Sequence, residues 1–479
     1  MKRVLAGIFL LVLAAAGMYG YMASERERSY RKAIAAGDAA VGRENSSAAI
    51  EAYSGAITLK PDAMLGYLKR GQTYRRRGEF PAAIRDLRRA SDLDPSATRP
   101  LEELGDAYLA DTPHRYSSAA ERYAAYVKLD NRAARVLYKL AFALFSDGHA
   151  AGAIEALHSA IALDDRFAEA YYLLGLCERD AQHPEAARRA LETSIALQPT
   201  LLHAREQLAD LYGAMGRADG RIAQLKALSV FDPGASREVT LGLEFARAGQ
   251  PDLAVLTLGR ASERYPDYPY AYVALGRVWL EIAQARHDRV ALSKALLALE
   301  GAVGGDDSSE ARTLFGRALL MTSDAETAER MLEDAAQKQP ADPLAYYYLA
   351  DAAERLGHYD VARQALLDYT VLVGEERDAR RRSAQAARLG DLSLRMNEPA
   401  AAAAYFLRAA EANASDATLL ARAADAQLRA GDPDTARATI TNALAKDPAN
   451  PVALSVARRL IPTRRLPRTQ GLTGSRPQS

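Results

Sequence analysis

The stretch from Met64 to Pro95 reads MLGYLKRGQTYRRRGEFPAAIRDLRRASDLDP and contains the clearest structural pattern in this protein. It divides into two segments of helix-forming residues, and Gly78 stands between them. Glycine adopts positive φ at little cost and so ends a helix, while Pro95 stops the second segment from continuing. Small residues in both segments, Gly71 and Ala83, allow two helix axes to approach closely. The stretch therefore predicts a pair of tightly packed helices.

The same arrangement recurs along most of the chain with a period of about 34 residues. Units start near residues 30, 64, 98, 134, 168, 202, 235, 268, 309, 343, 383 and 417. Glycines that would separate the two helices of a unit stand at 78, 148, 216, 249, 357 and 431, and prolines that would close the second helix at 95, 199, 233, 266, 340 and 448. Such periods are typical of helical arrays, in which each unit covers the apolar face of the next.

One unit matches a known repeat at nearly every signature position. The matching residues are Tyr67, Gly71, Tyr74, Gly78, Ala83, Leu87, Ala90 and Pro95. This unit resembles the tetratricopeptide repeat family, and so does the unit from 168, although Glu178 and Ser194 replace a usual large residue and a usual alanine there. The resemblance implies an all-α fold, an α-solenoid of about twelve antiparallel helical hairpins in a right-handed superhelix. It covers almost the whole chain after the N-terminal segment.

Three insertions interrupt the regular spacing. Two extra residues lie around Asp111 to His114, and about seven lie near Glu281 to Lys294, so we expect longer turns or extended helices at these points. The third, Gly374 to Arg382, carries mixed charges that suit an exposed, ion-paired segment. We expect a solvated surface there rather than a docking site.

The N-terminal residues 1–24 form a separate segment. Val4 to Ala23 is an uncharged, mostly apolar run that as a helix would span about 30 Å, enough to cross a bilayer. It predicts a membrane anchor, with two alternatives: a cleaved signal peptide with a small-x-small site at Ala14 and Ala16, or a buried core helix. Lys2 and Arg3 favour a cytoplasmic N-terminus, although basic residues on the other flank oppose this.

Residues 25–460 make up the predicted solenoid, closed by a last helix from Pro451 to Leu460. Residues 461–479 are rich in Pro, Arg, Gly, Ser and Thr, and such a composition has little to bury. We therefore predict a disordered C-terminal tail.

Composition argues against catalysis and against nucleic-acid binding. The formal net charge is +1, and the single cysteine excludes a disulfide framework or a multi-cysteine metal site. No metalloprotease, nucleophile-elbow or phosphate-loop motif occurs, and we expect no cofactor and no metal. Cys177 lies mid-helix and is interpreted as a buried thiol rather than a nucleophile, and His149, His183 and His358 as turn residues. We expect a protein that is not an enzyme.

In proteins that look like this one, ligands lie in the concave groove lined by the first helix of each unit. Projecting that groove onto this chain gives ten candidate protein-binding residues: Tyr138, Phe142, Phe145, Tyr172, Leu176, Arg179, Tyr270, Arg277, Tyr347 and Asp351. Aromatic side chains with arginine are typical of interface hot spots. The alternative for any single one of these aromatics is packing between repeats.

These features together favour a membrane-tethered scaffold that binds other proteins or peptides. The arginine-rich composition indicates a bacterial source, and anchored relatives suggest the inner membrane with a periplasmic solenoid in a polysaccharide-export, secretion or cytochrome-maturation complex. Alternatives are a secreted or periplasmic protein after signal cleavage, the same scaffold facing the cytoplasm, and an enzyme subunit with an unrecognised site. The partner and the oligomeric state stay open.

Overall fold

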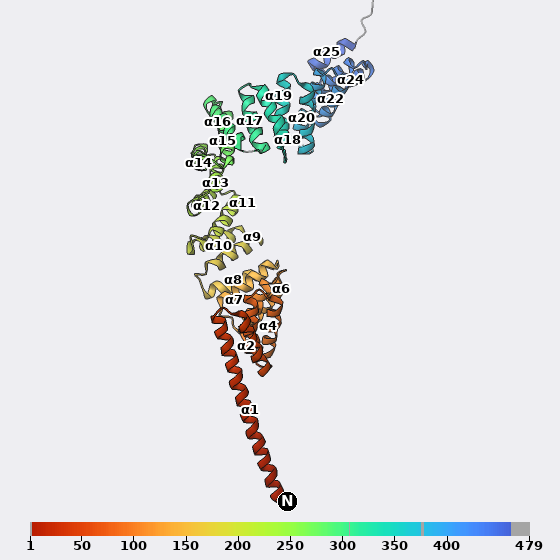
Figure 1. Ribbon diagram of the computed structural model, residues 1–479. Helices are drawn as coiled ribbons and strands as arrows, with labels where there is room; N and C mark the ends of the chain where they lie inside the picture. Colours follow the sequence, from red (N-terminus) through yellow and green to blue (C-terminus); the bar gives the residue numbers. More distant parts are fainter. Residues whose placement is uncertain (1, 306, 375–377, 461–479) are drawn as a thin grey trace, which may run out of the picture. The chain divides into compact units, whose positions relative to one another are not determined.

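The computed structural model describes residues 2–305, 307–374 and 378–460, and side chains from Ile8 onward (Figure 1). Every regular element in these ranges is an α-helix, which confirms the predicted fold class. The chain divides into two compact units, 1–232 and 233–479. The first unit holds α1 (Lys2–Gly42), α2 (Ser46–Leu59), α3 (Met64–Arg76), α4 (Phe80–Leu93), α5 (Thr98–Ala110), α6 (Tyr116–Leu129), α7 (Ala134–Ser146), α8 (Ala150–Leu163), α9 (Ala168–Asp180), α10 (Pro184–Leu197), α11 (Leu202–Ala214) and α12 (Ala218–Phe231).

The second unit continues the same alternation of helices. It holds α13 (Ala235–Arg247), α14 (Pro251–Arg264), α15 (Pro269–Arg286), α16 (Arg289–Gly305), α17 (Ser309–Met321), α18 (Ala325–Gln337), α19 (Pro343–Leu356), α20 (Tyr359–Val373), α21 (Ala379–Arg395), α22 (Pro399–Ala412), α23 (Ala417–Arg429), α24 (Pro433–Lys446) and α25 (Pro451–Leu460). Twelve consecutive pairs form hairpins, so the predicted repeat number is confirmed. The right-handed course of the superhelix stays a prediction.

In eleven of the twelve hairpins, the turn between the two helices contains a residue at positive φ. All six predicted glycines adopt this conformation, with Gly78 at φ 77° as an example. Five further hairpins use other residues at the same place, namely Glu44, Gln182, His287, Ser323 and Asn397. Glu44, Gln182 and Ser323 carry no sequence signal for such a turn, because side chains other than those of asparagine, aspartate and histidine seldom occupy this region.

A small residue on the first helix receives a large residue from the second. A Cβ on Gly71 would lie 2.8 Å from Leu87 Cγ, and one on Gly175 would lie 2.6 Å from Leu191 Cγ. The close approach predicted from Gly71 and Ala83 is present, but Leu87 is the side chain that fills the space over the glycine. Glycine is therefore required here by packing.

The insertions lengthen elements in different ways. The extra residues near 281–294 extend α15 and α16, and the turn between them has only two residues, His287 and Asp288. The extra residues near 111–114 instead lengthen the connection between α5 and α6. At the third insertion, α21 begins at Ala379, four residues before the predicted unit start, because the Asp378 side chain accepts a hydrogen bond from the Arg380 backbone and caps the helix.

Helix α1 runs without interruption from the apolar segment into the first hairpin. The large apolar side chains from Ile8 to Met22 are 52–78% exposed, so the alternative of a buried core helix is wrong. By length and apolarity this one helix could be an anchor or a signal segment. Further along, Tyr30 and Ile34 are buried against α2, where α1 serves as the first helix of a repeat.

Helix α25 lies where the last helix was predicted. Its Ala453, Val456 and Leu460 are buried against Ala424 of α23 and Ile440 of α24. This helix therefore covers the apolar face of the final hairpin. The predicted tail, residues 461–479, lies outside the described residues.

Candidate protein-binding surfaces

The predicted residues on α7 and α9 mostly pack between repeats. Tyr138, Phe145 and Leu176 lie against a buried cluster that includes Leu157. The ring of Tyr138 also lies 5.1 Å from that of Phe167, between ring centres. These side chains therefore hold adjoining hairpins together, and a binding role for them stays a prediction.

The other three predicted residues of the first unit differ in exposure. Tyr172 packs against a separate cluster that includes Leu191 and Leu208. Arg179 is half-buried and bonds Asp180 and Gln207. Phe142 is 39% exposed, so its ring is the most available of the three to a partner.

The predicted residues of the second unit take part in contacts between repeats. Tyr270 packs beside Val273, and Arg277 of α15 forms an ion pair with Glu310 of α17. Tyr347 is 38% exposed, and the Arg388 guanidinium lies 5.8 Å from its ring centre. Asp351 accepts a hydrogen bond from Arg355 of the same helix at 2.8 Å and lies 3.8 Å from the guanidinium of Arg388 in α21. Arg277 and Tyr347 remain partly accessible on the helices where the sequence analysis placed them.

A groove of about 770 Å³ crosses the first helices of three successive repeats, α15, α17 and α19. Arg277 is the one predicted site residue in its wall. The sequence analysis missed side chains of two kinds: some enter from the connections before α17 and α19, among them Ser308 and Lys338, and others, such as Glu281 and Tyr348, lie within the first helices themselves. Loop residues carry no periodic signal, so repeat spacing could not identify them.

Charged side chains of both signs line this groove. Lys338 Nζ lies 2.8 Å from Asp307 and lowers the pKa of that carboxyl. At the other end Arg277 pairs with Glu310, and Glu281 makes no ion pair with any residue that the structure describes. The groove thus presents fixed positive and negative groups that a charged peptide can match.

Apolar surface accompanies these charges. Leu344 at the start of α19 is 45% exposed in the groove wall. The Tyr348 ring lies below the Arg317 guanidinium, 5.7 Å from ring centre to carbon, and burial raises the pKa of its hydroxyl. An apolar side chain of a ligand can therefore be buried between charged groups.

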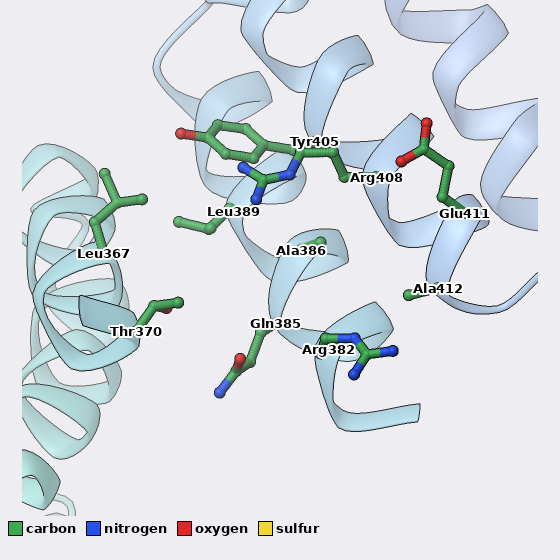
Figure 2. A pocket seen from close by; sticks show the side chains of 10 residues that line it. All are labelled: Leu367, Thr370, Arg382, Gln385, Ala386, Leu389, Tyr405, Arg408, Glu411 and Ala412. Carbon is green, nitrogen blue, oxygen red and sulfur yellow. The ribbon is translucent and has the colours of Figure 1, made fainter. Parts of the chain in front are cut away.

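Second helices of neighbouring repeats enclose a different kind of cleft. Figure 2 shows one of about 550 Å³, with Leu367 and Thr370 of α20 on one side, Leu389 of α21 within it, and Tyr405 and Arg408 of α22 opposite. In the first unit a cleft of about 590 Å³ occupies the equivalent place between α6, α7 and α8.

The cysteine and three of the histidines lie at positions that stabilise the fold. Cys177 is fully buried, and burial raises the pKa of its thiol to about 12, so the thiol stays protonated near neutral pH. The turn positions predicted for His149, His183 and His358 are confirmed, since each precedes the first residue of a second helix. His358 Nδ1 lies 2.9 Å from Glu329 of the preceding repeat.

The sequence model of the tetratricopeptide repeat matches residues 34–98, 68–134, 138–201, 313–379 and 387–451, more than half of the chain. The chain belongs to the tetratricopeptide repeat family. Proteins of this family are typically non-catalytic scaffolds that bind proteins or peptides. The hairpins α11 to α16 fall between the matched segments, yet they have the same tetratricopeptide architecture.

Small glutamine-rich tetratricopeptide repeat-containing protein 2 of Mycosarcoma maydis is 33% identical over 96 residues, 20% of this chain and 27% of that protein. The chain thus spans about a quarter of that relative's length. MamA is 29% identical over 35% of this chain and 91% of its own, with a TM-score of 0.34. YrrB, described as having an unusual peptide-binding site, is 18% identical over 39% and 96%, with a TM-score of 0.36.

Proposed function

We propose that this tetratricopeptide repeat protein is a membrane-tethered scaffold that holds a partner through a peptide segment bound in the groove of α15, α17 and α19. The observation that carries the proposal is the wall of that groove, in which exposed Leu344 lies among charged side chains of both signs. Peptides bind such surfaces by burying an apolar anchor and pairing their flanking charges.

The tether in this proposal is α1, whose apolar side chains have no protein neighbours over the described part of the membrane-length segment. The inner membrane of a bacterium, with the solenoid on the periplasmic side, suits this arrangement. A complex of the envelope, of the polysaccharide-export, secretion or cytochrome-maturation type, is then the assembly that the scaffold organises.

The experiment compares two leucine variants of the full chain, purified from membranes at native expression. Leu344→Arg places a charge in the groove, while Leu297→Arg makes the same change on α16, where Leu297 is 73% exposed and outside the groove. We expect wild type and Leu297→Arg to retain the same partner and Leu344→Arg to lose it. Recovery of the protein alone in all three samples, or equal retention by both variants, would refute the groove as the binding site.

A further inference from the structure

An exposed apolar surface covers all sides of α1 from Ile8 to Met22. Soluble monomers rarely leave so large an apolar surface in water, so this part of α1 needs apolar surroundings. Tyr19 and Tyr21 stand near the C-terminal end of the run, where aromatic residues of membrane helices meet the headgroups.

The helix has no hinge where the apolar run ends. Ser24, Glu25 and Arg26 follow Ala23 without glycine or proline, and α1 continues as one helix to Gly42. Gly20 and Ser24, whose hydroxyl donates a hydrogen bond to the Tyr21 carbonyl, are residue types at which helices can bend. The backbone nevertheless stays helical through this point, and Figure 1 shows α1 running straight. The apolar run and the first hairpin therefore share one straight support.

Helix α2 contacts α1 immediately after the apolar run. Lys60, at the end of α2, forms an ion pair with Glu27, and its ammonium lies 5.3 Å from the ring centre of buried Tyr30. From Ala23 to Glu27 the helix rises only about 6 Å. Each headgroup layer of a bilayer is about 5–7 Å thick, so the Glu27–Lys60 pair would lie at its outer edge.

This geometry also selects which end of the hairpin faces the bilayer. Helix α2 starts beside the end of α1 and finishes at Lys60, beside Glu27. The turn that follows, Pro61 to Ala63, is therefore on the side of the apolar run. Exposed Arg26, Arg28 and Lys32 surround the same level of α1, where positive charge suits anionic headgroups.

We propose that the turn between α2 and α3 rests against the headgroups of a phospholipid bilayer, held there by α1 as a rigid strut. The inference rests on the proposed function, because it requires α1 to lie in a membrane. Its consequence is that the repeat array leaves the bilayer at a fixed angle and height instead of hanging from a flexible linker.

The test measures the height of two single-cysteine probes above vesicles of phosphatidylcholine and phosphatidylglycerol that carry a fluorescent headgroup acceptor. The full chain is labelled at Asp62→Cys or Arg43→Cys in a Cys177→Ala background, both sites being exposed at opposite ends of the first hairpin. We expect the Asp62 probe to lie about 20 Å closer to the headgroups than the Arg43 probe, from the helical rise between Glu27 and Gly42. Equal heights would overturn the inference.

Flotation with the vesicles separates the inference from the proposal on which it rests. A chain that does not float overturns both, whereas a chain that floats with equal probe heights overturns only the rigid strut. A matched variant carries roughly ten Gly and Ser residues between Ser24 and Glu25, and it should float while the two heights become equal. If the two probes still differ in height after the linker is inserted, the inference is also overturned, because the continuous helix would then not set their distances from the headgroups.

Discussion

Gly276 of α15 lies directly against Leu299 of α16, and a Cβ on Gly276 would come within 2.5 Å of Leu299 Cγ. Twenty-three positions separate these residues, against sixteen for Gly71 and Leu87, which make the same contact. The seven extra residues extend both helices away from the contact, so the hairpin absorbs the insertion without changing how its helices nest.

The contact predicts that Gly276→Ala destabilises the second unit. The added methyl group collides with Leu299, and such overpacking costs about 1–3 kcal/mol. The midpoint of urea unfolding, followed by helical circular dichroism, should fall. Gly259→Ala in α14 is the control, because no atom lies within 4 Å of a Cβ there and alanine favours helix by about 1 kcal/mol. A Gly276→Ala protein as stable as the control would contradict the packing role.

Tyr123 on α6 should stabilise the first unit through its hydroxyl as well as its ring. The hydroxyl donates a hydrogen bond to Asp106 at 2.7 Å, and Lys139 of the next repeat pairs with the same carboxylate. Tyr123→Phe should lower the free energy of unfolding by about 1–2 kcal/mol, since the hydrogen bond has a charged acceptor. The hydroxyl of Tyr116 has no hydrogen bond to the described residues, so Tyr116→Phe should leave the urea midpoint unchanged.

His358 should make stability depend on pH near neutrality. Its hydrogen bond to Glu329 raises the pKa of the imidazole above 6.5 in the folded protein. Because the pKa of His358 is higher in the folded than in the unfolded protein, its interaction with Glu329 adds fully to the free energy of unfolding below pH 6.5. That stabilisation is lost as the pH rises through the pKa of the folded state.

We therefore expect wild type to exceed His358→Gln in melting temperature at about pH 6 and to match it at about pH 8.5. Subtracting the melting temperature of the variant from that of wild type at each pH removes the effect of other titrating groups. A difference that stays constant between the two pH values would show that the ion pair with Glu329 does not contribute.

Phe142 and Tyr172 should respond differently to truncation although both were predicted as binding residues. Tyr172→Ala removes a ring packed on Leu191 and Leu208 and should lower the free energy of unfolding by about 1–2 kcal/mol. Phe142→Ala removes a ring that is 39% exposed, so the melting temperature should change little. Partner retention from membrane extracts then tests binding with Phe142→Ala alone. Unchanged retention would assign Phe142 to surface packing.

The hairpins were predictable because their signal is local and periodic. Gly78 and Pro95 mark helix ends through their own backbone restrictions, whatever surrounds them. Glu44 and Gln182 adopt the same turn conformation but were missed, since the neighbouring helices impose positive φ on residues that do not favour it.

The candidate site was predictable only in part. Repeat register placed Arg277 on the groove helices, but it could not place Lys338 or Ser308, which enter the groove from connections outside the periodic pattern. Nor could register separate exposed Phe142 from Tyr172, because both are large aromatics on first helices.

Stacked helical hairpins behind a long apolar segment follow from the order of the amino acids alone, because residue size and backbone preference act within each repeat. Three other properties are visible only in the folded chain: which aromatics stay accessible, where loops complete the groove, and that α1 enters the first hairpin without a break. Those properties depend on how neighbouring helices pack, and a pattern of residues within one repeat does not record its neighbours.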